Sequence, residues 1–450
     1  MVGAEALVPT LHGTSVRYVN LDNAASTPPL RSVAEAITDL LPYYASVHRG
    51  AGQKSRLCTA AYEAARDRVG SFFGADPDRD VVIFGKNTTE AINKLAHRLP
   101  LDADAVVLST LAEHHSNLLP WRSRAALEHV AVLPDGSIDE DDLDDKLCRY
   151  RGRVALVAVN GASNVTGIVP PIERFATKAH AVGAAILVDG AQLAPHRPVD
   201  MNSHDDPAHI DYLAISGHKL YAPFGTGALI GPRSTFDQGE PEYGGGGTVV
   251  VVTADGVLWD DAPARDEAGS PNIVGAVALG VALTTLAEIG MDTVAANEHV
   301  LLTRLLEGLD RIEGVELHGP RDPAADRVGV VPFDVVGVDH RLVAARLAHE
   351  YGIGVRSGCF CAQPLVAKLL DIPTPDPGSW VPEPDGARPG LVRASLACYT
   401  EASDVDRLLD AVREICANPA TFNYRLDAEN QFVPNDHAEW LPPELQHLTV

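Results

Sequence analysis

The middle of the chain alternates continuous apolar runs with segments whose apolar residues are spaced as on one face of a helix. Val154–Val159 and Ala184–Val188 are apolar throughout, which is typical of strands that are buried on both faces of a sheet. Between them, residues 171–183 have helical spacing and end at a glycine. Three further runs predict strands of the same sheet: Val81–Phe84, Ala105–Leu108 and Asp211–Ile215. This alternation predicts an α/β fold with a doubly wound, mainly parallel sheet.

The pattern changes after residue 285, where strand and helix signals no longer alternate regularly. We predict helices over residues 294–309, 342–349 and 404–416, and strands over residues 328–333 and 354–356, which together indicate a smaller α+β domain. Residues 371–390 are rich in proline and glycine and predict an irregular loop. The expected organisation is a large domain over residues 22–290, a small domain formed by residues 1–21 and 291–416, and a C-terminal extension over residues 417–450.

Charge and composition exclude several classes of protein. The 450 residues include 61 Asp and Glu against 36 Lys and Arg, a formal net charge of −25, so neither nucleic acid nor an anionic membrane is an expected partner. No apolar run reaches the about 18 residues of a membrane-spanning helix, and the N-terminus lacks the features of a signal peptide. We therefore expect a cytoplasmic protein. Of the six cysteines only Cys359 and Cys361 are close in sequence, so we expect reduced thiols and no metal site.

Polar clusters follow four of the predicted strands, at the edge of the sheet where ligands of open α/β folds bind. Thr88 and Thr89 open a helix, where hydroxyls and free backbone N–H groups suit a phosphate. The other clusters are Glu113-His114-His115, Asp189 with Gln192, and Ser216 with His218 and Lys219. Each alone also fits an ordinary role as a helix cap, a structural histidine or a surface lysine. Together they supply the phosphate site, flat imidazole, carboxylate and amine that suit pyridoxal 5'-phosphate (PLP).

Ten short motifs extend this pattern over residues 20–415: LDNAAST (21–27), VHRG (47–50), TTEAIN (88–93), EHHSNLLPW (113–121), SNVTG (163–167), DGAQLAPH (189–196), SGHKLYAPFGTGAL (216–229), DEAGSPN (266–272), RSGCFCAQP (356–364) and RASLACYT (393–400). In this order they resemble the class V aminotransferase superfamily of fold-type I PLP enzymes, and within it the type II branch of the cysteine desulfurase and selenocysteine lyase group. The resemblance implies the fold-type I transferase fold, PLP as cofactor, and a homodimer in which Ser270 contacts the phosphate of the neighbouring subunit.

The resemblance also implies a role for each matching residue. Lys219 would bind PLP covalently and remove the substrate's α-proton, His114 would stack on the ring, and Cys361 would be the sulfur-accepting nucleophile. The other cofactor contacts would come from Thr88, Thr89, Ser216 and His218 at the phosphate, Asp189 at the pyridine nitrogen, and Gln192 and Asn164 near the phenolic oxygen. Arg393 and Arg356 would bind the substrate, since a planar guanidinium suits an α-carboxylate.

These roles predict a cysteine desulfurase, a carbon–sulfur lyase that takes sulfur from L-cysteine as a persulfide on Cys361 and releases L-alanine, with a protein as a candidate sulfur acceptor. Two alternatives stay open: a class V aminotransferase, epimerase or β-lyase acting on another amino acid, and a catalytically inactive sulfur-relay or scaffold protein. Selenocysteine also stays open as the substrate.

The chain departs from the type II pattern at Cys359-Phe360, where two histidines are typical. Cys359 has either a packing role or a redox role together with Cys361. Side chains two residues apart on an extended strand project to the same side, and a flexible loop would also allow the two sulfurs to meet.

Overall fold

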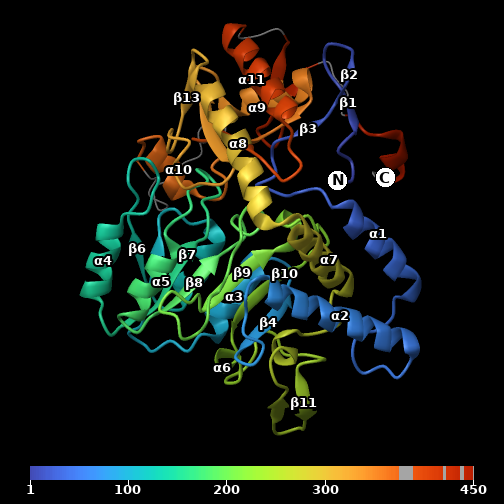
Figure 1. The fold of residues 1–450 in the computed structure, drawn as a ribbon, viewed down its shortest axis with the longest axis vertical. Coiled ribbons are helices and arrows are strands. Elements are labelled where there is room, and N and C mark those ends of the chain that lie inside the picture. Colours follow the sequence, from blue (N-terminus) through green and yellow to red (C-terminus); the bar gives the residue numbers. More distant parts are fainter. Residues whose placement is uncertain (374–388, 419–421, 436–439, 449–450) are drawn as a thin grey trace.

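The computed structural model describes residues 1–373, 389–418, 422–435 and 440–448. Most of the loop predicted over residues 371–390 lies outside the described residues, as do parts of the predicted C-terminal extension. The described residues form two main β-sheets, one above the other in Figure 1, each accompanied by helices.

The larger sheet has seven strands within the described residues, in the order β4-β10-β9-β8-β7-β5-β6. Their bounds are Asp80–Gly85 (β4), Val106–Thr110 (β5), Ala126–Val130 (β6), Val154–Asn160 (β7), Ala185–Asp189 (β8), Tyr212–Ser216 (β9) and Gly227–Pro232 (β10). Strand β10 is antiparallel to both its neighbours, β4 and β9, and the other adjacent pairs among these strands are parallel. The mainly parallel sheet confirms the predicted α/β fold.

Alternate residues of the strands enter two separate apolar clusters, which explains the continuous apolar runs in the sequence. In β4, Val82 and Phe84 join a cluster formed with helices α1, α2, α4, α5 and α7, whereas Val81 and Ile83 join a cluster with α3 on the other face. The helices span Arg31–Leu40 (α1), Gln53–Phe72 (α2), Thr88–Arg98 (α3), Glu140–Arg149 (α4), Ile172–His180 (α5) and Ile273–Ile289 (α7). Helices therefore cover both faces of the sheet, as a doubly wound fold requires.

The smaller sheet is antiparallel, with the strand order β13-β14-β17-β16. Its strands are Val315–Leu317 (β13), Val330–Val335 (β14), Arg356–Gly358 (β16) and Leu391–Ser395 (β17), and its helices are Met291–Asp310 (α8), His340–Tyr351 (α9) and Ala402–Ala417 (α11). Near the N-terminus, β3 (Val19–Asn20) pairs with β15 (Ile353–Gly354), and Val19 joins the apolar core of this sheet. The division into two domains stays a prediction. The smaller sheet has an apolar cluster of its own with α8, α9 and α11, but Val330 and Leu391 of this sheet belong to a cluster of the larger sheet.

Short elements complete the described chain. Near the N-terminus, β1 (Leu7–Pro9) pairs with β2 (Ser15–Arg17), and β11 (Val249–Val252) with β12 (Val257–Trp259) forms a hairpin that projects from the lower end of the molecule in Figure 1. Helices α6 (Arg233–Phe236) and α10 (Gln363–Leu369) are brief. After α11, β18 (Tyr424–Leu426) and β19 (Phe432–Pro434) form a hairpin within the predicted C-terminal extension.

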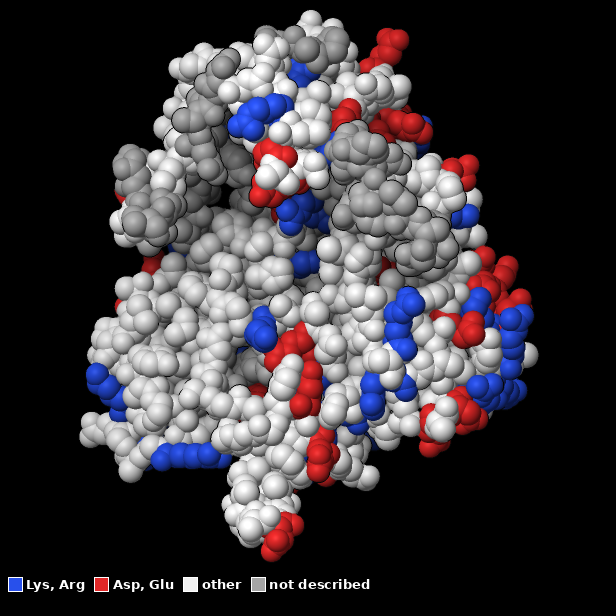
Figure 2. All heavy atoms as spheres, turned by 180° about the vertical axis from the view of Figure 1, so that it is seen from behind, with Lys and Arg blue, Asp and Glu red and all other residues white. Residues whose placement is uncertain are grey.

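The surface charges are mixed on the face seen in Figure 2, where acidic and basic side chains are interspersed. In the part of the chain that the structure describes, no single helix is long and apolar enough to cross a membrane. Helices α7 and α8, which are bent relative to each other, together have the length and composition of a membrane span, and nothing else supports that reading.

Candidate functional site

A cavity of about 910 Å³ lies beyond the carboxyl ends of the parallel strands, where β16 and β17 of the smaller sheet approach the larger one. Every predicted site residue except Ser270 lines it: Thr88, Thr89, His114, Asn164, Asp189, Gln192, Ser216, His218, Lys219, Arg356, Cys361 and Arg393. The structure therefore brings together in space residues that are spread over more than 300 positions of the sequence.

One end of the cavity is formed by the start of helix α3. The backbone N–H of Thr88 donates to Ser216 Oγ at 2.8 Å, and the two hydroxyls lie 2.8 Å apart. Thr89 Oγ1 lies 2.6 Å from Ser116 Oγ. Because hydroxyls gather here at the positive end of an eleven-residue helix, this end suits a phosphate.

The amine of Lys219 lies in the cavity, on a side chain that is partly buried. Burial lowers the pKa of Lys219 to about 8, although the nearby charge of Asp189 acts in the opposite direction. Burial raises the pKa of Asp189, which is countered by the backbone N–H of Ala191 at 3.0 Å and by Lys219. An amine that loses its proton readily is suited to condense with an aldehyde.

The imidazole of His114 is neutral near pH 7, because burial lowers its pKa to about 4 and Lys219 contributes in the same direction. The backbone N–H of Ser116 donates to His114 Nδ1 at 3.1 Å, so this nitrogen has no proton. The proton of the neutral ring therefore lies on Nε2. Such a ring can stack on a flat cofactor and can also donate or receive a proton at a defined atom.

Glu113, directly before His114, is a buried carboxyl. The sequence placed it in one of the four polar clusters, but no role was predicted for it. Its oxygens accept hydrogen bonds from Thr110 at 2.7 Å, Asn117 at 2.8 Å and Asn160 at 2.9 Å. Burial raises the pKa of Glu113 to about 7 in spite of these donors. The hydrogen bonds connect the loop after β5 to the end of β7 and so hold His114 in place.

The orientation of Gln192 is fixed by a buried chain of hydrogen bonds that begins on helix α8. Glu298 Oε2 lies 2.5 Å from His196 Nδ1, and a carboxylate can only accept, so the ring proton lies on Nδ1. His196 Nε2 must then accept from the amide nitrogen of Gln192, at 3.0 Å. This leaves the amide oxygen of Gln192 to accept from Lys219 Nζ, at 3.4 Å.

We expect Glu298→Gln to lower the pKa of Lys219 below about 8, since the new amide allows the His196 proton to move to Nε2 and the Gln192 amide to turn. The measurement is the pH midpoint for modification of Lys219 by an amine reagent in the cofactor-free protein, followed by peptide mass. Glu288→Gln, on the exposed end of α7, is the control. An unchanged midpoint in Glu298→Gln would contradict the chain of contacts.

Arg393 is the buried cation of the cavity. Its guanidinium donates to the carbonyl of Asn164 at 2.8 Å and to Asp22 at 3.2 Å, and lies 4.8 Å from the centre of the Phe360 ring. Burial lowers the pKa of Arg393 to about 10, which keeps it protonated at neutral pH. Among the described residues, its Nε has no hydrogen-bond partner. Arg356 is half-exposed, with Nε 3.7 Å from Asp22.

Cys361 is exposed and lies in a turn between β16 and α10. Phe360 and Cys361 have φ values of 53° and 54°, and β16 ends at Gly358, so the cysteine pair lies in a turn and not on an extended strand. The turn is held by Asn164, which donates to the Phe360 carbonyl at 2.7 Å, and by the His115 N–H, which donates to the Cys361 carbonyl at 2.7 Å. These contacts present the Cys361 thiol to the cavity.

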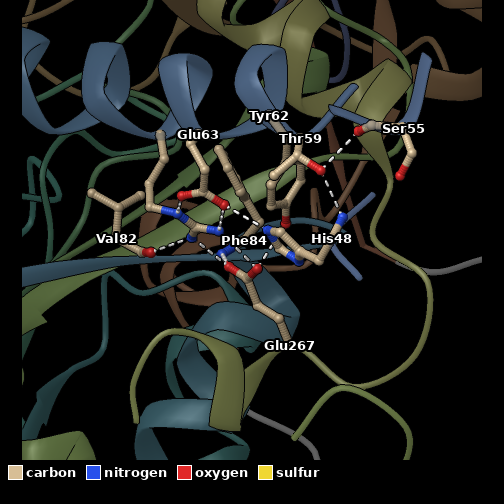
Figure 3. A network of polar contacts seen from close by, with 9 residues as sticks. His48, Ser55, Thr59, Tyr62, Glu63, Val82, Phe84 and Glu267 are labelled. Atoms are coloured by element: carbon tan, nitrogen blue, oxygen red, sulfur yellow. Dashed lines mark hydrogen bonds and ion pairs between the residues drawn. The ribbon is translucent and has the colours of Figure 1, made fainter. Parts of the chain in front are cut away.

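Ser270 is exposed and lies outside this cavity. The segment that contains it is anchored by Glu267, three residues earlier, in the network of Figure 3. Glu267 accepts from Arg66 at 2.6 Å, from the Tyr62 hydroxyl at 2.7 Å and from the Phe84 backbone at 2.6 Å. The base of the segment is thus fixed on α2 and β4 while Ser270 stays open to solvent.

The residues present fit PLP by their chemistry. The helix start with its hydroxyls suits the phosphate, the buried Asp189 suits a protonated ring nitrogen, and Lys219 suits the aldehyde. No group of three or more His, Cys, Asp or Glu residues within the described ranges is arranged to hold a metal ion.

The sequence model of the family described as "Aminotransferase class-V" matches residues 19–408. The chain belongs to this family. Among its curated relatives, a cysteine desulfurase from Haloferax volcanii is 35% identical over 422 residues, which cover 91% of this chain and 92% of the relative. A cysteine desulfurase from Pectobacterium atrosepticum is 36% identical over 420 residues, with coverage of 91% and 95%.

Solved structures of cysteine desulfurases agree with these relatives. The apo cysteine desulfurase of Thermococcus onnurineus NA1 has a TM-score of 0.78 and 34% identity, covering 89% of this chain and 95% of that chain. The cysteine desulfurase CsdA of Escherichia coli, in an S-sulfonic acid form, has a TM-score of 0.75 and 33% identity, covering 88% and 94%. The resemblance that the motifs predicted is confirmed.

Proposed function

We propose that this class V enzyme is a PLP-dependent cysteine desulfurase, which removes sulfur from L-cysteine as a persulfide on Cys361 and releases L-alanine. The observation that carries the proposal is the presence of a partly buried amine and an accessible thiol in one cavity, Lys219 and Cys361. The four cysteine desulfurases compared above, at 33–36% identity over most of the chain, support the same reaction.

PLP would be held by the phosphate site at the start of α3, by Asp189, and by Lys219, with His114 against its ring. When bound, PLP draws electrons away from the bonds of the substrate's α-carbon. Arg393 binds the substrate's α-carboxylate, and Lys219 Nζ removes the α-proton. The Cys361 thiolate attacks the substrate sulfur, so that a sulfur–sulfur bond forms as the carbon–sulfur bond breaks. A proton delivered to the β-carbon and the return of a proton to the α-carbon complete alanine.

Product analysis tests this proposal. Incubation with L-cysteine and a reductant should yield alanine and sulfide in equal amounts. A keto acid without sulfide would indicate an aminotransferase, and pyruvate with sulfide would indicate a β-lyase. If no product forms although the cofactor is bound, the scaffold alternative gains support. Parallel assays with L-selenocysteine show whether the enzyme releases alanine faster from the sulfur or from the selenium amino acid.

We also propose that the protein is a homodimer that passes its sulfur to a protein acceptor. The exposed position of Ser270 supports a contact with the neighbouring subunit's phosphate site, and the exposed thiol of Cys361 supports transfer to a second protein. Sedimentation of the PLP-bound protein should give a dimer. A fully active monomer with bound PLP would contradict the shared site.

A further inference from the structure

The hairpin formed by β18 and β19 lies after residue 408, where the match to the class V family ends. It nevertheless reaches the active site. Its turn residues Glu429, Asn430 and Gln431 line the same cavity as Lys219 and Cys361. Helix α9 and strand β16 also contribute lining residues, among them Arg341 and Arg356, and Arg341 contacts the turn.

The turn has an internal structure that fixes its shape. The carboxylate of Asp427 accepts from the backbone N–H groups of Glu429 at 2.9 Å and Gln431 at 2.8 Å, and the Asp427 N–H donates to the Gln431 carbonyl at 2.9 Å. Asn430 has a φ of 58°, a left-handed conformation that asparagine tolerates better than most residues. The tip is therefore a defined turn.

Helix α9 holds the hairpin against the cavity. Near the tip, Arg341 donates to the Asn430 carbonyl at 3.2 Å, and its guanidinium lies 5.6 Å from the centre of the Phe432 ring. At the base, the Tyr424 hydroxyl donates to Glu350 at 3.0 Å, and Glu350 is itself paired with Arg346 at 2.9 Å. This ion pair is almost fully buried, with side-chain exposures of 2% and 1%. Contacts at both ends make the hairpin a fixed wall.

We propose that the hairpin over residues 424–434 forms the outer wall of one side of the active-site cavity and determines by size which molecules reach Cys361 from that side. The wall admits a small amino acid and restricts bulkier reactants there, whereas a protein acceptor would approach Cys361 from the second cavity that this thiol lines, which contains no hairpin residue among those described. The inference rests on the proposed function in taking Cys361 as the sulfur carrier, but access to a thiol can be measured without any turnover.

The test compares how fast Cys361 reacts with small iodoacetamide and with a bulky fluorescein maleimide, in the PLP-bound protein. Peptide fragmentation assigns the label to Cys361 and not to Cys359. A chain ended after Asn418 lacks the hairpin, whereas a chain ended after Asn435 keeps it and is the matched control. Loss of the hairpin should raise the maleimide rate several-fold relative to the iodoacetamide rate, and the control should match the full chain.

Single substitutions keep the test decisive if the shorter chain does not fold. Glu429→Trp should narrow the entrance and lower the relative maleimide rate, and Glu429→Ala should raise it, with unchanged circular dichroism and PLP absorbance. Equal rate ratios in both variants and in the full chain would overturn the proposal. Since alkylation needs no desulfuration, this outcome is distinct from a failure of the proposed function, which alanine and sulfide measurements report.

Discussion

Cys361→Ser should lose alanine release from L-cysteine by at least about a thousandfold, the scale on which enzymes respond to loss of a nucleophile. The substitution nearly preserves volume but replaces a thiol with a hydroxyl, which stays protonated near pH 7 and is a poor acceptor for sulfur. The measurement is the initial rate of alanine formation. The variant should still bind PLP and still change its visible spectrum on addition of L-cysteine, because the groups that hold PLP and bind the α-carboxylate are unchanged.

Two matched variants accompany Cys361→Ser. Cys148→Ser removes an exposed thiol on α4 and should leave the rate unchanged. Cys359→Ser separates the two open roles of that residue: unaltered activity favours packing, and lost sensitivity to mild oxidation favours a redox role with Cys361. Alanine production by Cys361→Ser at a rate near that of the native chain would show that this thiol is not the acceptor, and would favour a lyase or aminotransferase.

Lys219→Ala should abolish the borohydride-reducible attachment of PLP. It should also lower the turnover rate with L-cysteine by about 10²–10⁴-fold, the usual contribution of a general base. The amine of Lys219 is the group in the cavity whose pKa is lowered to about 8, so it can both form the attachment and accept the α-proton near neutral pH. Reduction with borohydride followed by peptide mass locates the attachment.

Lys368→Ala, on the exposed side of α10, is the control for Lys219→Ala and should keep both the attachment and the activity. PLP trapped on another lysine of the Lys219→Ala protein, with turnover retained, would refute the assignment. PLP bound without a covalent attachment, with turnover lowered by that factor, is the expected outcome, because the phosphate site at α3 and Asp189 remain.

The sequence predicted the sheet well because its buried parallel strands are continuous apolar runs. Strands β6 and β10 were missed. Strand β6 lies at the edge of the sheet and is only partly buried, so it is no continuous apolar run. Strand β10 contains two glycines and a proline, which are weak strand formers. The predicted strand over residues 354–356 was only partly right, because β15 ends at Gly354 and β16 begins at Arg356. The turn at Phe360 and Cys361 could not be predicted in detail, since no local pattern signals that both residues adopt a left-handed backbone.

Residues at the ends of strands could be found from the sequence, because the carboxyl edge of the sheet brings them together. The residues that hold these side chains in place, from distant parts of the chain, could not be found in this way. Glu298 contacts His196, which lies 102 positions away in the sequence and in turn contacts Gln192. Asp22 pairs with Arg393, which lies 371 positions away. The active-site hairpin carried one local signal, the turn residues Asp427 and Asn430 between two short apolar segments, but its position beside α9 depends on long-range contacts.

The most direct test of sulfur transfer to Cys361 is the mass of the peptide that contains it after a single turnover. The PLP-bound protein is mixed with less than one equivalent of L-cysteine, without reductant, and then alkylated and digested. We expect the peptide to gain one sulfur atom, assigned by fragmentation to Cys361, in an amount equal to the alanine released. Alanine released in that amount with Cys361 unmodified would contradict the account.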